Sequence, residues 1–120
     1  MNPAAGAQDS TMDLTRLHDL MLKIRVSYPF DAAHYPELKG ADVRKTLEFA
    51  VEHSLMHSIK SLGTIAAESE RADHGGQMDH GNLYKATAKM VINVLNLANA
   101  IGVSAEELAI GIRHELDSHR

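Results

Sequence analysis

The chain has 120 residues, of which 44% are hydrophobic and 4% aromatic, and this length suits one domain with one core. Scarce aromatic residues and abundant Ala, Leu, Met and Ile favour packed helices over strands. Cysteine is absent, which excludes disulfides and thiolate metal sites. The net charge of −4, with dispersed Lys and Arg, argues against a nucleic-acid partner. No apolar run reaches the roughly 18–20 residues of a membrane span and no targeting signal is present, so we expect a cytoplasmic protein without a membrane partner.

The N-terminal residues 1–10 are small and polar, and we expect them to form a flexible tail before a single helical domain over residues 11–120. The first helix is predicted to begin near Ser10, where Ser10 and Asp13 have the spacing of a capping box, and to end near Val26. Its predicted buried face consists of Leu14, Leu17, Met21 and Ile24.

Residues 27–41 contain prolines and aromatic residues and are predicted to form an ordered loop anchored on the core. Asp42 is the predicted cap of a long second helix that ends near Arg71. Gly63 lies inside this helix at a cost of about 1 kcal/mol relative to alanine, which indicates a close helix contact. The predicted apolar stripe of the helix is Leu47, Val51, Leu55, Ile59, Leu62 and Ala66.

A turn-rich connection over residues 73–81 leads to a third helix, predicted over residues 82–101. Gly102 has the place of a left-handed residue that ends a helix, and Ser104 has the place of an N-cap. The fourth helix is predicted over residues 105–116. The chain is therefore predicted to be an all-α, four-helix bundle.

Two parts of the sequence carry a resemblance to a known family. The first is Leu14-x-x-Leu17-x-x-Leu20-Met21-x-Lys23-Ile24-Arg25 followed by Tyr28-Pro29-Phe30-Asp31. The second is the apolar third helix that reaches Ala100-Ile101-Gly102 before an acid-rich helix. In this order they resemble the MazG-type nucleoside triphosphate pyrophosphohydrolases, whose first helix is followed by a Cys-Pro-Trp-Asp segment. The resemblance implies a MazG-like bundle that pairs with a second copy.

The resemblance also implies a magnesium site made of Glu-x-x-Glu on the second helix and Glu-x-x-Asp on the third, because Mg²⁺ prefers oxygen ligands. The four corresponding positions here are Ser61, Thr64, Ala86 and Lys89, and none is acidic. Residues 53–67 and 81–105 contain no Asp or Glu, so no small shift of the alignment restores the acids. We therefore expect no catalytic residues and no cofactor.

In place of a magnesium site, we expect a polar pocket that binds its ligand without a metal. Cationic, hydroxyl and amide side chains on the second and third helices suit an anion such as phosphate or a nucleotide. The chain would then be a non-catalytic nucleotide- or phosphate-binding module, or a module for protein interaction. The same residues could instead form ordinary solvated helix faces. The candidate ligand-binding residues are His57, Lys60, Ser61, Thr64, Glu68, Lys89, Asn93 and Asn96.

Two alternatives use a metal. One is a nucleoside triphosphate pyrophosphohydrolase whose magnesium site has moved to Glu48, Glu52, Glu68, Glu70, Asp73 or Asp79. The other is a histidine-based site, because His53 and His57 have the i, i+4 spacing that places two imidazoles on one metal ion. His74, His80, Asp73 and Asp79 follow in the connection.

Self-association is the last expectation. The third helix is apolar around most of its circumference, more than one neighbouring helix can cover, and a dimer is the commonest symmetric solution. We expect a homo-oligomer, most simply a dimer, with Ile92 or Leu95 at the contact.

Overall fold

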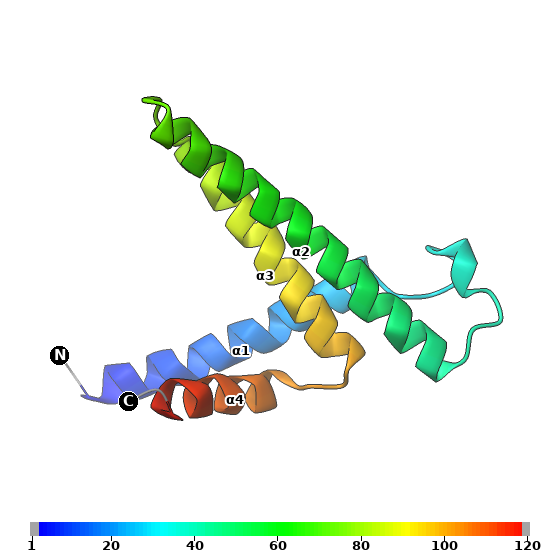
Figure 1. Ribbon diagram of the computed structural model, residues 1–120. Helices are drawn as coiled ribbons and strands as arrows, with labels where there is room; N and C mark the ends of the chain where they lie inside the picture. The colour runs from blue at the N-terminus through cyan, green and yellow to red at the C-terminus, as the bar shows by residue number, and fades with distance from the viewer. Residues whose placement is uncertain (1–2, 119–120) are drawn as a thin grey trace.

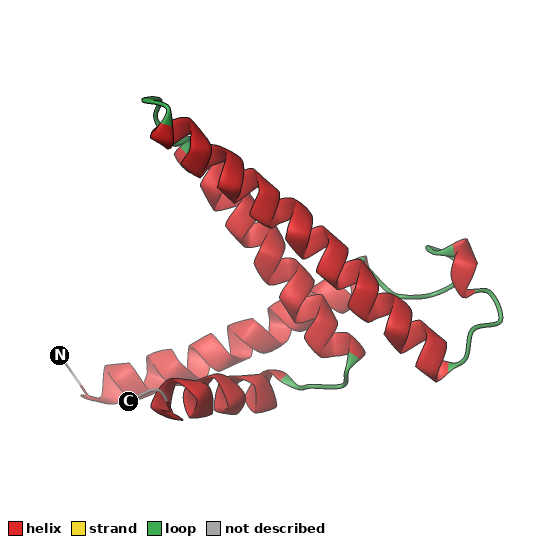
Figure 2. Ribbon diagram, viewed as in Figure 1, coloured by secondary structure: helices red, strands yellow, loops and turns green. Residues whose placement is uncertain are grey.

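The computed structural model describes residues 3–118, with side chains from residue 13 onward. This part of the chain is helical and contains no strand, which confirms the predicted all-α class (Figure 2). Its elements are α1 (Pro3–Ser27), the 3-10 helix η1 (Pro36–Leu38), α2 (Val43–Asp73), α3 (His80–Ala100) and α4 (Ala105–Ser118) (Figure 1).

The helices form two arms that share α3. In one arm, α2 and α3 run antiparallel as a long hairpin, and in the other α1 and α4 lie side by side (Figure 1). α1 also packs across α3, so that α3 joins the two arms. Among residues 3–118 no single helix is long and apolar enough to cross a membrane, although the bent pair α3 and α4, with 113° between them, meets the criteria together.

α1 begins well before the start that we predicted near Ser10. Its first residue is Pro3, which leaves residues 3–10 helical where we expected a tail. Proline is favourable in the first turn of a helix because its fixed φ suits the helix and its missing N–H is not needed there. Ala4, Ala5 and Ala7 then favour continuation. Residues 1 and 2 lie outside the described residues.

Two aspartates cap the helices of the hairpin. The side chain of Asp42 accepts a hydrogen bond of 2.8 Å from the backbone N–H of Lys45, as predicted for the start of α2. The side chain of Asp79 accepts one of 3.0 Å from the N–H of Asn82 and starts α3. Each bond satisfies an N–H that the first turn of a helix leaves without a partner.

The turn between α3 and α4 has the geometry predicted from its sequence. Gly102 has a φ of 78°, and the N–H of Val103 donates a 2.9 Å hydrogen bond to the carbonyl of Ala98. Ser104 and Glu107 exchange reciprocal side-chain-to-backbone bonds of 3.1 and 3.3 Å, which make a capping box. The direction of α4 is thus fixed by residues on both sides of the glycine.

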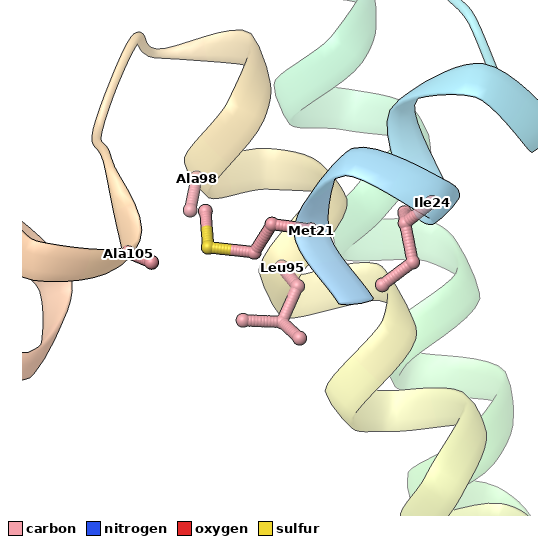
Figure 3. Close-up of a cluster of buried hydrophobic side chains, with 5 residues drawn as sticks. All are labelled: Met21, Ile24, Leu95, Ala98 and Ala105. Carbon is pink, nitrogen blue, oxygen red and sulfur yellow. The ribbon is translucent and has the colours of Figure 1, made fainter. Parts of the chain in front are cut away.

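The largest buried hydrophobic cluster lies where α1, α3 and α4 meet, and α2 contributes no residue to it (Figure 3). Two asparagines of α3 bind the end of α1 and the residue that follows it. The Asn99 amide donates a 2.8 Å hydrogen bond to the carbonyl of Met21 in α1, and the Asn96 amide donates one of 3.4 Å to the carbonyl of Tyr28, just after α1. The buried cluster is Met21, Ile24, Leu95, Ala98 and Ala105, with Leu17, Val103 and Leu108 packed around it.

The predicted apolar stripe of α2 is not buried in the chain. Its members are 37–57% exposed where they are large, and Ala66 is exposed too. α2 instead buries small side chains against α3, among them Ala50, Ser54 and Ser61. Gly63, which we expected at a close contact, has no atom within 4 Å of the place where a Cβ would lie. The prediction failed because the small residues let α2 approach α3 on a different face.

Candidate anion-binding pocket

A cavity of about 470 Å³ lies between α2 and α3, on the side of the hairpin that is nearer to the Tyr28 and Tyr35 loop. Because the helices run antiparallel, residues early in α2 lie opposite residues late in α3. The lining residues are Tyr28, Tyr35, His53, His57, Lys60, Ser61, Thr64, Asn82, Lys85, Ala86, Lys89, Ile92, Asn93 and Asn96.

Helical periodicity explains how each helix delivers its polar side chains to the cavity. On α2, the sequence from His53 through His57 and Lys60 to Thr64 advances by four, three and four residues. On α3, Asn82, Lys85, Lys89, Asn93 and Asn96 advance by three, four, four and three. Such spacings keep side chains on one face of a helix.

Three lysines give the cavity its charge. Lys60 comes from α2, and Lys85 and Lys89 come from successive turns of α3. No Asp or Glu is among the lining residues of the described chain, and none of the three lysines pairs with a described carboxylate. The cavity therefore has a net positive charge that the part of the chain in the structure does not neutralise.

Histidine and tyrosine form the end of the cavity that is nearest to the start of α2. The hydroxyl of Tyr35 and Nε2 of His53 share a hydrogen bond of 3.2 Å, and the rings of His53 and His57 are 4.3 Å apart between centroids. Partial burial, and then the neighbouring His57, lower the pKa of His53 from its ordinary value. Burial raises the pKa of Tyr35. Both groups are thus held in their neutral forms near pH 7.

Aromatic packing keeps this end of the cavity in place. Phe30 and Tyr35 from the loop stack with ring centroids 5.8 Å apart, and Tyr35 lies 5.0 Å from Phe49 on α2. Phe49 in turn stacks on His53 at 5.6 Å. The sequence predicted that the loop would be anchored on the core, whereas Phe30 and Tyr35 pack on α2, away from the core cluster.

The structure brings together all of the predicted ligand-binding residues except one. His57, Lys60, Ser61, Thr64, Lys89, Asn93 and Asn96 all line the cavity. Of these, Asn96 also donates a hydrogen bond to the carbonyl of Tyr28, the residue that follows α1. Glu68 does not line the cavity, and its prediction as a ligand-binding residue needs correction.

Glu68 joins the last turns of α2 to the start of α3. The residue is 2% exposed, and its carboxylate accepts hydrogen bonds from the Arg71 guanidinium at 2.9 Å, the Asp79 backbone N–H at 2.7 Å and the Asn82 amide at 3.0 Å. Those bonds, the one from Asp79 first, lower the pKa of Glu68. With its oxygens occupied in this way, the carboxylate has a structural role.

Several lining residues were missing from the predicted set. Asn82 and Lys85 share the helical face of Lys89, so the spacing alone could have found them. His53 similarly precedes His57 by one turn of α2. Tyr28 and Tyr35 belong to a loop, and periodicity carries no information about where a loop returns to a helix. The remaining two, Ala86 and Ile92, are apolar.

The four positions that the MazG resemblance assigns to magnesium-binding acids are Ser61, Thr64, Ala86 and Lys89, and all four line this one cavity.

The acids considered for a relocated magnesium site do not gather elsewhere in the described part of the chain. Among the side chains that the structure describes, from residue 13 to residue 118, no group of three or more His, Asp or Glu could hold a metal ion. Comparison with protein families, with characterised proteins and with solved structures finds no match.

Proposed function

We propose that the chain is a MazG-like domain in which a cationic pocket has replaced the magnesium site, and that this pocket binds the phosphate group of a nucleotide without hydrolysing it. The observation that carries the proposal is the convergence of Lys60, Lys85 and Lys89 on a cavity that no described Asp or Glu lines. Ammonium groups beside a cavity favour a polyanion and disfavour a divalent cation.

The other lining groups suit the same ligand. The amides of Asn82 and Asn93 and the hydroxyls of Ser61 and Thr64 are hydrogen-bond donors for phosphate oxygens. Their position in a cavity partly shielded from water makes each charge-assisted bond stronger than it would be on an open surface. A cavity of about 470 Å³ lies within the range of small-molecule sites.

The chain has no acidic residue at the four positions where the MazG resemblance implies magnesium ligands, and for this reason we propose binding without catalysis. Hydrolysis by the MazG mechanism needs metal ions that bridge the phosphates and activate water. Ser61, Thr64 and Ala86 supply no negative charge, and Lys89 supplies a positive one. Binding should therefore be independent of magnesium.

Thermal shift and calorimetry with inorganic phosphate, AMP and ATP, all in EDTA, test the proposal. A ligand that binds only the folded state raises the melting temperature of the protein. We expect Lys89→Gln to weaken binding by about tenfold or more, as the loss of one charge-assisted contact implies. Lys23→Gln, which removes a lysine of α1 outside the cavity, is the matched control and should bind like the unmodified chain. Binding that requires Mg²⁺, or that survives Lys89→Gln, would contradict the proposal.

A further inference from the structure

The two ends of the pocket differ in their chemistry. One end, the lysine end, is lined by Lys60, Lys85 and Lys89. The other, the aromatic end, is lined by Tyr35, His53 and His57. Burial lowers the pKa of His53 and raises the pKa of Tyr35, so both side chains are uncharged near pH 7. A ligand that fills the cavity therefore needs an anionic part and a part that is polar without charge.

The hydrogen bond between Glu68 and Asn82 shows which residues of α2 and α3 lie opposite one another. Because the helices run antiparallel, each step back along α2 from Glu68 corresponds to a step forward along α3 from Asn82. His57 and Asn93 are each eleven residues from that bond, so they lie opposite each other, and both line the cavity. Asn93 is about 6 Å along α3 from Lys89. The pair of His57 and Asn93 is thus one helical turn from the lysine end.

His57 and Asn93 both have hydrogen-bonding groups to spare. Within residues 13–118, no residue forms a hydrogen bond with the His57 ring or with the Asn93 side-chain amide. A neutral imidazole and an amide each present a donor and an acceptor. Phosphate oxygens accept hydrogen bonds, so a phosphate satisfies the donors and leaves the acceptors without a partner. A hydroxyl group donates and accepts at once, and it suits both side chains.

The rings of the aromatic end use their faces on one another. Phe49 stacks on His53 with centroids 5.6 Å apart, and Phe30 stacks on Tyr35 at 5.8 Å. The ring of His57 lies 4.3 Å from that of His53. The polar atoms of this end include the Tyr35 hydroxyl and Nε2 of His53, which share a hydrogen bond of 3.2 Å. Since a nucleobase binds by stacking on an open ring face, this end suits hydroxyl groups better than a base.

We propose that His57, Asn93 and the Tyr35 hydroxyl bind the hydroxyl groups of a sugar whose phosphate is held at the lysine end. The ligand class is then a sugar phosphate, free or as the ribose phosphate of a nucleotide. One helical turn separates the two groups of side chains, a distance that a single sugar ring can span. A base attached to the sugar adds little to binding. This inference rests on the proposed function, because it begins with a phosphate held by the lysines.

Calorimetry at pH 7.5 in EDTA tests the inference with ribose 5-phosphate and phenyl phosphate. Both are phosphate monoesters, but phenyl phosphate has a flat ring and no hydroxyl group. We expect ribose 5-phosphate to bind about tenfold more tightly, as one or two additional hydrogen bonds imply. AMP should bind within about threefold of ribose 5-phosphate. Equal affinity for the two monoesters, or AMP binding tenfold more tightly than ribose 5-phosphate, would overturn the inference.

Variants of the pocket assign the sugar to its residues through the ratio of the two dissociation constants. His57→Phe keeps a ring and removes both nitrogens, and Asn93→Leu removes the amide, so each should reduce the advantage of ribose 5-phosphate severalfold. Lys85→Gln is the matched control, because it weakens both monoesters by the same factor and preserves the ratio. Circular dichroism checks that each variant keeps its helix content. A ratio that is unchanged in both His57→Phe and Asn93→Leu would contradict the inference.

The same measurements separate a failure of this inference from a failure of the proposed function. If the two monoesters bind equally and Lys89→Gln weakens both, the lysine end binds phosphate and only the sugar assignment is wrong. If neither monoester binds to the unmodified chain, the proposed function and the inference are both wrong.

Discussion

Glu68 on α2 and Asn82 on α3 are joined by a 3.0 Å hydrogen bond from the asparagine amide to the buried carboxylate. The same carboxylate accepts from the backbone N–H of Asp79, the residue that caps α3. Asn82 also lines the pocket. One carboxylate therefore joins the end of α2, the start of α3 and the wall of the cavity.

Glu68 should make stability depend on pH in the acid range. Its pKa in the folded chain is below the unfolded value of 4.5, so the unfolded state binds the proton more readily. Its contribution is fully present above pH 4.5 and is lost as the pH falls through the lower folded pKa. Melting curves from pH 6 to pH 3 should show a falling melting temperature, and Glu68→Gln should be less stable at pH 6 and less sensitive to acid. An equal pH dependence in both proteins would assign it to other groups.

No nucleotide should be hydrolysed by the purified protein. The pocket holds lysines where a magnesium mechanism needs acids, so release of pyrophosphate should stay at background for each common nucleoside triphosphate with Mg²⁺ or Mn²⁺. A phosphate-release assay after pyrophosphatase treatment measures this. Turnover abolished by Asp73→Asn or Asp79→Asn would support the relocated metal site instead.

Anion binding should strengthen as the pH falls from 7.5 to 5.5. The lowered pKa keeps His53 neutral near pH 7, and a bound anion would favour its protonated form. Sulfate is the appropriate probe because it does not titrate in this range. We expect about tenfold tighter binding at pH 5.5, as one more charge-assisted hydrogen bond implies. His53→Gln should remove most of the difference, and an unchanged profile would place the titrating group elsewhere.

Two glycines near α4 should respond oppositely to alanine. Gly111 is inside α4 with no atom within 4 Å of the place that a Cβ would take, so Gly111→Ala should stabilise the fold by about 0.5–1 kcal/mol. Gly102 has a φ of 78°, and Gly102→Ala should destabilise by about 1 kcal/mol or more. Urea denaturation of the two variants measures both changes, and shifts of the same sign would contradict this account.

Truncation of the core should cost far more than truncation of the surface. Leu95 is 6% exposed in the cluster between α1, α3 and α4, and Leu95→Ala should lower the free energy of unfolding by about 2–5 kcal/mol. Leu116 on α4 is 67% exposed, and Leu116→Ala should change it by less than about 0.5 kcal/mol. Similar losses in the free energy of unfolding for the two variants would contradict the position of the core between α1, α3 and α4.

The sequence predicted the helices better than it predicted their contacts. Asp42, Gly102 and Ser104 were informative because caps and left-handed turns depend on a few local atoms. The start of α1 was wrong because Ser10 matches a capping pattern that also occurs inside a helix. Local signals of this kind determine where a helix can begin, but not whether an earlier start is equally favourable.

The candidate pocket was predictable where it depends on helical faces, as for Lys60, Lys89 and Asn93. The prediction for the apolar stripe of α2 failed because periodicity shows that a helix face is apolar without showing whether the rest of the chain covers it. The prediction that Glu68 binds the ligand failed for a related reason. Its position on the polar side of α2 suggested a ligand, whereas its partners at Asp79 and Asn82 come from across a turn whose path the sequence does not specify.

The confinement of the largest core cluster to α1, α4 and the last turns of α3 predicts that parts of the chain differ in stability. None of the clustered core residues comes from α2, so the hairpin can open locally while the core stays intact. Amide hydrogens of α2 should then exchange with solvent before those around Leu95. A ligand in the proposed pocket would contact this less stable arm, and it would slow the exchange of the α2 amides while leaving the core amides unchanged.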